Sequence, residues 1–304
     1  MTSSTEACRP NGMLFTIASS ISGVVPCTRI SVSTAPGVNA FTVIPVGPNS
    51  RASALVNPRT AAFADVLAVI YKDLANIRPQ DPEWFDRDRV LLSMGHYAIA
   101  EYAALAEAGV IPVEELETYG SDDSRLPMSG MSTYTPGMEI SGGSLGHGLG
   151  VAVGMALGLR FQGNGARVIN MMSDGELDEG STWEAAMAAA HHGLGNLLCV
   201  VDINQLQADG PTAGVLRTEP LIDKWQAFGW RTVRVDGNDI NALLTAFDSV
   251  PPGDQPAVVL CDTRIGRGVP FLETREKAHF IRIDEHEWDL ARQALRAANP
   301  AGSN

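Results

Sequence analysis

The sequence predicts an α/β protein in which a doubly wound, mostly parallel sheet is flanked by helices on both faces. Two apolar runs, residues 168–172 and 197–203, are typical of buried strands, and the Ala-rich segment between them, 179–192, is typical of a helix. Further strand and helix candidates alternate along the rest of the chain. Such alternation favours a parallel sheet with helices packed on each side.

Each element is assigned from the spacing of its apolar residues. Helices are assigned where apolar residues recur at helical spacing, and strands where short β-branched runs lie between turn residues. The expected order is a helix at 61–75, a strand at 90–92, helices at 97–108 and 146–161, a strand at 168–172, a helix at 179–192, a strand at 197–203, a helix at 220–228, a strand at 231–235, a helix at 240–247, a strand at 257–261 and a helix at 284–298. A stretch rich in Ser, Gly, Pro and Met, 120–143, is typical of a long active-site loop.

The start of the chain differs in composition from the remainder. No Asp or Glu occurs between Glu6 and Asp65, and Ser, Thr, Val and Pro dominate. We therefore divide the chain into a divergent N-terminal arm, 1–57, and an α/β domain, 58–304. An acid-poor, Ser-rich leader with a few Arg also fits a transit peptide.

Composition restricts the classes of partner. The net charge of −13 argues against general binding to nucleic acid or to anionic membranes. No apolar run approaches the roughly 18 residues of a membrane span. The four cysteines form no CxxC pair. Cys199 and Cys261 lie in apolar strand-like runs and are expected to be buried free thiols. We expect a cytoplasmic protein.

Polar residues follow the two strands that flank the Ala-rich helix. Asp174 comes directly after the first strand, and Asn204 comes directly after the second. Because parallel strands end at the same edge of a sheet, these side chains should present two oxygens side by side. A hard cation such as Mg²⁺ requires such ligands. Gly175 would let a phosphate approach the backbone closely.

Four motifs give the chain a resemblance to a known family. They are DRDRVLLSMGH at Asp86–His96, GSLGHGL at Gly143–Leu149, SDGELDEG at Ser173–Gly180, and VDIN at Val201–Asn204, which Asp209-Gly210 follows. Residues 60–284 resemble the diphosphate-binding half of transketolase, specifically the N-terminal subunit of split bacterial transketolases. The resemblance implies that 58–304 is a thiamine-diphosphate domain, with thiamine diphosphate and Mg²⁺ as cofactors.

The resemblance also implies roles for individual residues. The Mg²⁺ ligands would be the side chains of Asp174 and Asn204 and the carbonyl oxygen of Leu206. Gly175 would donate a backbone N–H to the diphosphate, and His96 would contact the diphosphate as a donor. The implied cofactor-binding set is His96, Gly143, Leu145, Asp174, Gly175, Glu176, Asn204 and His279.

Three of the implied residues have roles nearer the reaction. His96 and His279 would lie near the diphosphate, His279 also near the substrate. Glu179 resembles the family's interface glutamate, which helps to couple the two active sites of a dimer. Simpler interpretations exist: His96 also fits a helix-start residue, and Glu179 also fits a solvated helix start with favourable dipole placement.

The resemblance implies a partner subunit. The family's glutamate that protonates N1′ of the cofactor's aminopyrimidine lies on a second, pyrimidine-binding domain, which this chain is expected to lack. The chain should therefore be inactive alone and should pair with a C-terminal-type subunit to form a heterotetramer with two copies of each chain. No nucleic-acid or membrane partner is expected.

Two departures concern the substrate. The family's GHPGGS segment is replaced by 55–60, and its GHPE segment in the long loop is replaced by Leu126–Met131. Both lost histidines contact sugar hydroxyls in transketolases, so ordinary pentose phosphates are in doubt. We expect transfer of a two-carbon ketol unit from a ketose or 2-oxo donor to an aldehyde acceptor. The alternatives are a subunit of a split 2-oxo-acid decarboxylating synthase or dehydrogenase, a non-catalytic scaffold, and, more distantly, a Mg²⁺-dependent phosphohydrolase.

Glycines recur at a regular spacing after the GSLGHGL motif begins. Gly146, Gly150, Gly154 and Gly158 lie four residues apart and share one helix face. Each costs about 1 kcal/mol relative to Ala in a helix interior. We infer that another backbone packs closely against this face, either from the chain's own core or, as the resemblance favours, from another subunit.

Overall fold

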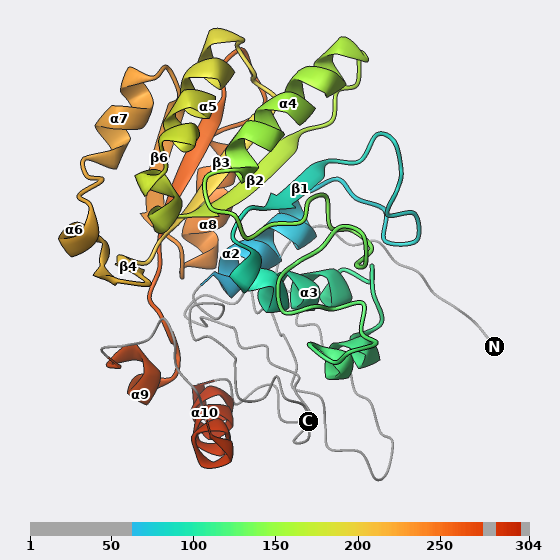
Figure 1. The fold of residues 1–304 in the computed structure, drawn as a ribbon, viewed down its shortest axis with the longest axis vertical. Coiled ribbons are helices and arrows are strands. Elements are labelled where there is room, and N and C mark those ends of the chain that lie inside the picture. Colours follow the sequence, from blue (N-terminus) through green and yellow to red (C-terminus); the bar gives the residue numbers. More distant parts are fainter. Residues whose placement is uncertain (1–62, 276–283, 299–304) are drawn as a thin grey trace.

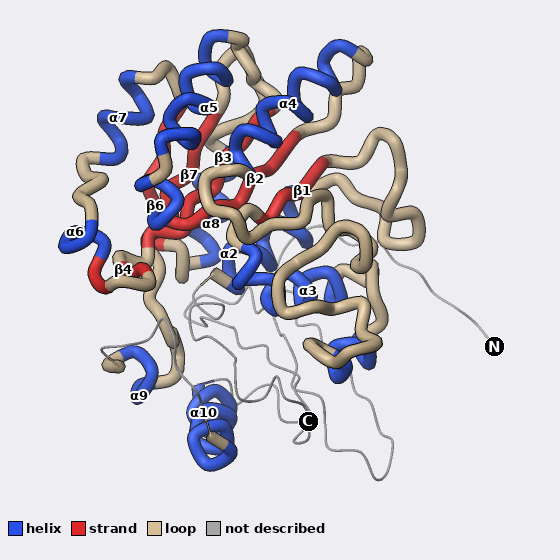
Figure 2. Tube along the Cα trace, viewed as in Figure 1, coloured by secondary structure: helices blue, strands red, loops and turns tan. Residues whose placement is uncertain are grey.

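The computed structural model describes residues 63–275 and 284–298, and a five-stranded parallel sheet lies at its centre (Figures 1 and 2). The strand order is β1-β2-β3-β7-β6, and every neighbouring pair is parallel. The strands of this sheet are β1 (Arg89–Leu92), β2 (Val168–Ser173), β3 (Leu197–Ile203), β6 (Arg231–Asp236) and β7 (Ala257–Asp262). A separate antiparallel pair joins β4 (Leu206–Gln207) to β5 (Gly210–Pro211).

Helices cover both faces of the sheet. The α-helices are α2 (Ala64–Val69), α3 (Ala98–Glu107), α4 (Gly148–Phe161), α5 (Gly180–His191), α6 (Thr212–Val215), α7 (Leu221–Ala227), α8 (Ile240–Asp248), α9 (Pro270–Glu273) and α10 (Glu285–Ala298). A π-helical turn, η2 (Ile70–Leu74), extends α2. The short 3₁₀ helices are η3 (Gly95–Tyr97), η4 (Val113–Thr118) and η5 (Asp174–Asp178).

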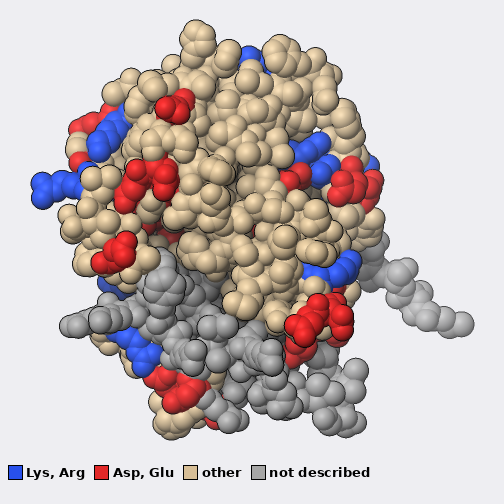
Figure 3. All heavy atoms as spheres, in the orientation of Figure 1, with Lys and Arg blue, Asp and Glu red and all other residues tan. Residues whose placement is uncertain are grey.

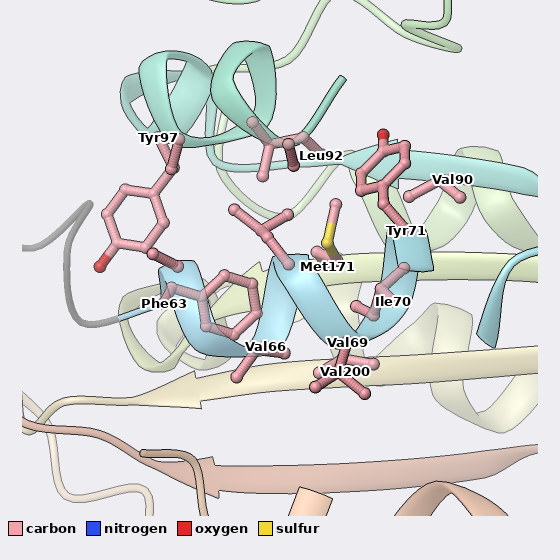
Figure 4. Packing of buried hydrophobic residues seen from close by; sticks show 14 of the residues in the cluster. Phe63, Val66, Val69, Ile70, Tyr71, Val90, Leu92, Tyr97, Met171 and Val200 are labelled. Atoms are coloured by element: carbon pink, nitrogen blue, oxygen red, sulfur yellow. The ribbon is translucent and has the colours of Figure 1, made fainter. Parts of the chain in front are cut away.

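The two faces of the sheet bury separate hydrophobic clusters. Val90 and Leu92 of β1 face one cluster, with α2, α3 and α8, whereas Leu91 faces the other, with α4, α5 and α7. This alternation follows from the two-residue period of a strand. In Figure 4, Val66 and Ile70 of α2 and η2 lie among side chains of the first cluster. Burying each Val, Leu or Ile side chain contributes roughly 1.5–3 kcal/mol, so the strands are anchored from both sides.

The predicted fold class is confirmed, and each predicted strand is present. The predicted helices are also present, with shifted ends. The helix predicted from residue 146 begins at Gly148, because Gly146 has a φ of +78°, which a right-handed helix does not accommodate. The β4–β5 pair was not predicted. The boundary predicted at residue 57 lies outside the described residues.

The structure also bears on the predictions for the cysteines and for membrane-spanning segments. Cys199 and Cys261 are buried and free, as predicted. Within residues 63–275 and 284–298, no helix is long and apolar enough to cross a membrane.

The glycine face of α4 is open. Gly150, Gly154 and Gly158 would each accept a Cβ atom with no neighbouring atom of the described residues within 4 Å. Gly146 precedes the helix and is buried against Glu179 and Ser181. The prediction that the chain's own core packs closely against this face is therefore wrong for the part of the protein that the structure describes. Contact with another subunit stays a prediction.

Candidate cofactor site

The carboxyl ends of three neighbouring strands bring the predicted site residues to one edge of the sheet. Leu92 of β1 pairs with Met171 of β2, and Ser173 of β2 pairs with Asp202 of β3. The chain leaves these strands toward His96, Asp174 and Asn204 respectively. The three segments therefore meet at the edge where open α/β sheets bind ligands.

Asp174 joins the end of β2 to the turn after β3. Its side chain is 2% exposed. Its Oδ2 atom accepts the backbone N–H of Gln205 at 2.7 Å and the hydroxyl of Thr212 at 3.2 Å. Gln205 has a φ of 62°, the only positive φ of a non-glycine residue within the described ranges. The carboxylate therefore helps to hold a strained turn immediately beside Asn204.

Asn204 has a fixed side-chain orientation. Its amide nitrogen donates to Asp202 Oδ2 at 2.7 Å and to the Tyr97 hydroxyl at 3.2 Å. Its carbonyl oxygen accepts the backbone N–H of Leu206 at 3.0 Å. Because an amide oxygen has two lone pairs, it can still accept a cation on the Leu206 side.

Glu176 ties the loops of the site together. The side chain is fully buried, and its Oε1 atom accepts from the Ser93 hydroxyl and, at 3.0 Å, from the backbone N–H of Gly146. Its Oε2 atom accepts the backbone N–H of Ser173 at 3.1 Å. Burial raises the pKa of Glu176, while the three donors oppose that shift. Both oxygens bind protein donors, and the predicted contact of Glu176 with a cofactor stays a prediction.

Glycines form a close-packed cradle beside these side chains. A Cβ atom at Gly142 would lie 2.3 Å from the Leu92 carbonyl oxygen, and one at Gly95 would lie 2.3 Å from Ser129 Oγ. Gly143 has a φ of +121° and donates its N–H to the Ser93 carbonyl at 2.9 Å. The segments at 92–95 and 142–143 thus approach at backbone distance, which only glycine permits, and the Ser129 side chain packs beside them. Leu145 follows and is half-buried.

The remaining predicted residues occupy different positions. His96 is half-buried in η3, and its ring centroid lies 4.8 Å from that of Tyr97. Gly175 is half-buried in η5, directly after Asp174. Glu179 precedes α5 and is exposed, which fits either an interface residue or a solvated helix start. His279 lies outside the described residues.

The donor set fits a hard divalent cation bound together with a phosphorylated ligand. Within the described ranges, no group of three or more His, Cys, Asp and Glu side chains could hold a metal. A cation here would instead use the Asp174 carboxylate, the Asn204 amide oxygen and the Leu206 carbonyl, with its other positions filled by ligand oxygens. Mg²⁺ accepts such a set, because it is usually bound by one or two carboxylates plus substrate phosphates.

Sequence reasoning missed four residues that organise the site. Ser93, Tyr97, Asp202 and Thr263 all contact Glu176 or Asn204 or support a residue that does. Asp202 offered a signal, because it is a carboxylate within an apolar strand and lies two residues before Asn204. Residues two apart on a strand face the same side.

Comparison with known proteins identifies a family for this architecture. The family described as the transketolase thiamine diphosphate binding domain matches residues 57–301. A transketolase family protein of Sinorhizobium fredii, y4mO, is 63% identical over 237 residues, which are 77% of this chain and 85% of that protein.

Two further relatives are named as subunits. An apulose-4-phosphate transketolase subunit of Actinobacillus succinogenes is 40% identical and matches 76% of this chain and 84% of that protein. The 6-deoxy-6-sulfo-D-fructose transketolase subunit SqwG of a Clostridium strain is 37% identical, over 76% of this chain and 84% of that protein.

Solved transketolases share the fold. A Pichia stipitis transketolase in complex with fructose-6-phosphate superposes with a TM-score of 0.72 and 29% identity, covering 80% of this chain and 37% of that one. The Leishmania mexicana transketolase superposes with a TM-score of 0.70 and 27% identity, covering 83% of this chain and 43% of that one. The chain therefore spans about two fifths of the length of these transketolases.

Proposed function

This chain belongs to the transketolase family through its thiamine-diphosphate-binding domain, and from that premise we propose that it is the N-terminal subunit of a split, Mg²⁺-dependent transketolase-like enzyme. Membership of the family makes it part of a transferase that uses thiamine diphosphate. The proposed reaction moves a two-carbon ketol unit from a ketose or 2-oxo donor to an aldehyde acceptor.

One observation carries the proposal more than any other. The Asp174 carboxylate accepts a hydrogen bond from the backbone N–H of Gln205 at 2.7 Å. This bond places the carboxylate, which follows β2, beside the turn that carries Asn204, which follows β3. This arrangement supports a divalent cation held by Asp174, Asn204 and the Leu206 carbonyl. The cation would anchor the diphosphate, while Gly175 would donate its N–H to that group.

The other candidate residues have supporting roles in the proposal. His96 would donate a hydrogen bond to the diphosphate, and the backbone around Gly143 and Leu145 would flank the aminopyrimidine. Thiamine diphosphate, when bound, supplies the carbon nucleophile of the reaction. The chain's own residues hold and orient that cofactor, and His279 is proposed to lie near the substrate.

A partner subunit completes the proposed enzyme. Three of the relatives are named as transketolase subunits, which implies a second subunit in those proteins. We propose that a pyrimidine-binding subunit supplies the glutamate that protonates N1′ of the cofactor. Two copies of each chain would form the assembly, with Glu179 at an interface.

The open face of α4 is the proposed contact between subunits. Gly150, Gly154 and Gly158 share this face with Val151, which is 42% exposed, and Phe161, which is 83% exposed. Figure 3 shows few charged side chains on the surface over α4 and α5. An apolar, glycine-rich face lets a second helix approach closely, which supports an interface here.

The substrate names of relatives favour a ketose donor. Those relatives are named for apulose-4-phosphate and for 6-deoxy-6-sulfo-D-fructose, both of which are ketoses. Ser129 lies against Gly95 and Gly143, within the loop segment that replaces the family's GHPE. A serine there offers a smaller polar group than histidine, which supports a substrate other than an ordinary pentose phosphate.

An exchange assay separates the proposal from its rivals. The chain and its partner subunit would be incubated with ¹³C-labelled ketose phosphates, a sulfonated ketose and 2-oxo acids, and the products followed by NMR. Transfer of a labelled two-carbon unit to an aldehyde supports the ketol transfer. A ketose donor would leave a shortened aldose and no CO₂, and a 2-oxo acid donor would release CO₂ together with the transfer. Release of CO₂ from 2-oxo acids with no reaction of any ketose would favour the decarboxylating alternative, and no turnover with any donor would favour a scaffold.

A further inference from the structure

We propose that Asp202 and Tyr97 are positioning residues that orient the Asn204 side chain so that its oxygen faces the cation. This inference rests on the proposed function, because it assumes that Asn204 holds a cation. It adds two residues that would act on the cation through Asn204.

The Asn204 amide nitrogen donates to two acceptors that lie on the same side of it. They are Asp202 Oδ2 at 2.7 Å and the Tyr97 hydroxyl at 3.2 Å. The Tyr97 hydroxyl in turn donates to the same Asp202 Oδ2 atom at 2.7 Å. The three groups form a closed triangle of hydrogen bonds in which the Asp202 carboxylate oxygen is the shared acceptor.

This triangle permits only one orientation of the amide. A carboxylate only accepts hydrogen bonds, so a rotated amide would place its oxygen against the Asp202 oxygen. The Asn204 oxygen is thereby directed to the opposite side, where it accepts the Leu206 N–H at 3.0 Å. Leu206 also supplies the carbonyl proposed to bind the cation.

The surroundings of Asp202 keep the triangle rigid. Asp202 and Tyr97 are both fully buried. The second Asp202 oxygen accepts the hydroxyl of Thr263, which follows β7. A buried carboxylate with strong donors on both oxygens has little freedom to rotate, and a buried charge is tolerated only when it is paired in this way.

Tyr97 links this triangle to a second candidate residue. Its ring lies edge-on to that of His96, with 4.8 Å between the centroids and 73° between the planes. The ring also packs against Phe63, with 6.1 Å between the centroids. Figure 4 shows these two side chains near each other in the first cluster. One tyrosine thus supports both a proposed cation ligand and a proposed diphosphate donor.

Replacing Tyr97 by Phe tests the proposal with the loss of one hydroxyl. The complex of the full chain with its partner subunit would be titrated with Mn²⁺ in the presence of thiamine diphosphate, and free Mn²⁺ would be followed by electron paramagnetic resonance. We expect Tyr97→Phe to weaken Mn²⁺ binding by about tenfold or more, as is usual when a partner of a metal ligand is lost. Asp202→Asn, which can no longer accept from every donor, should weaken it at least as much.

Tyr102→Phe is the matched control. Tyr102 is also fully buried, lies on the following turn of helix, and donates one hydrogen bond, to the Pro127 carbonyl at 3.0 Å. It should lose a similar amount of thermal stability while keeping wild-type Mn²⁺ affinity. This difference separates positioning of Asn204 from a general structural effect.

Two results would overturn the inference without touching the proposed function. One is Mn²⁺ affinity of Tyr97→Phe within twofold of the wild type, and the other is an equal loss in Tyr102→Phe. If Asp202→Asn fails to fold, the comparison of Mn²⁺ affinity between Tyr97→Phe and Tyr102→Phe tests the inference without it. Failure of the wild-type complex with its partner subunit to bind Mn²⁺ with thiamine diphosphate would instead reject the proposed function, and this inference with it.

Discussion

The Asp174 carboxylate accepts the backbone N–H of Gln205 at 2.7 Å, which fastens the end of β2 to the turn that follows β3. The same turn presents Asn204 and Leu206. One carboxylate therefore both shapes the turn and stands beside the two other proposed oxygen ligands. Its removal should affect the cation site directly and through the position of its neighbours.

Asp174→Ala should abolish binding of thiamine diphosphate with Mg²⁺ while leaving a folded chain. The variant loses two hydrogen bonds, to Gln205 and Thr212, which are worth about 1 kcal/mol each. Isothermal titration calorimetry would measure the binding, and thermal denaturation would measure the stability. Asp248→Ala, an exposed carboxylate at the end of α8, is the control and should bind normally. Normal cofactor binding by Asp174→Ala would contradict the assignment of the cation site.

Glu101→Gln should remove a pH dependence of stability. Burial raises the pKa of Glu101 from 4.5 to about 8, although the Tyr71 hydroxyl donates to it at 2.8 Å. Between these two values the folded chain keeps a proton that the unfolded chain releases. The stability contributed by this proton is full below about pH 4.5 and is lost as the pH rises through about 8.

The size of this effect should be a few kcal/mol, because a pKa difference of one between the folded and unfolded chain corresponds to about 1.4 kcal/mol. Urea denaturation at about pH 5.5 and about pH 8.5, on either side of most of this titration, would show a smaller difference for Glu101→Gln than for the wild type. Glu114→Gln, an exposed carboxyl on η4, should retain the wild-type difference. An unchanged difference in Glu101→Gln would show that other groups control the pH dependence.

Two glycines near the same helix should respond oppositely to alanine. A Cβ atom at Gly148 would lie 2.3 Å from Ser93 Oγ and 2.9 Å from Asn170 Oδ1, so Gly148→Ala should destabilise the chain by about 1–3 kcal/mol. Gly154 has no described neighbour within 4 Å of such an atom. Gly154→Ala should stabilise the isolated chain by up to about 1 kcal/mol. Thermal denaturation of the two variants beside the wild type would measure both changes.

The interface proposal adds a second expectation for Gly154. If α4 packs against another subunit, a large side chain there should weaken assembly without unfolding the chain. Gly154→Trp should therefore shift the complex to smaller species in analytical ultracentrifugation, whereas Gln162→Trp, just past the end of α4, should not. Retention of the full assembly by Gly154→Trp would place the interface elsewhere.

Glu176→Gln should loosen the loops of the site. A glutamine has one carbonyl oxygen, so it cannot accept from Ser93, Gly146 and Ser173 together as the carboxylate does. We expect a weaker affinity for thiamine diphosphate and a lower melting temperature, and saturating cofactor should restore the melting temperature in part. A lower affinity with an unchanged melting temperature would favour direct contact with the cofactor over a scaffolding role.

Patterns with a clear period could be predicted from the sequence. The runs that became β2 and β3 are buried on both faces, and the helices between strands repeat at 3.6 residues. The edge positions of Asp174 and Asn204 followed from parallel strand order alone. The β4–β5 pair was missed because two residues, Leu206 and Gln207, are too few to show a period.

Side-chain partnerships were harder to predict. Ser173 and Glu176 form a capping box, and their S-x-x-E spacing is a known signal, yet the links to Ser93 and Gly146 join segments far apart in sequence. The same holds for Tyr97 and Asp202, which lie on different elements. Only the folded chain shows that these residues meet.

Native mass spectrometry of the chain, purified from its own host, tests the central claim most directly. We predict a complex with two copies of this chain and two of a second subunit, carrying thiamine diphosphate and Mg²⁺. A homo-oligomer without the second subunit that takes up no added thiamine diphosphate would contradict the split-enzyme account and leave the scaffold alternative ahead.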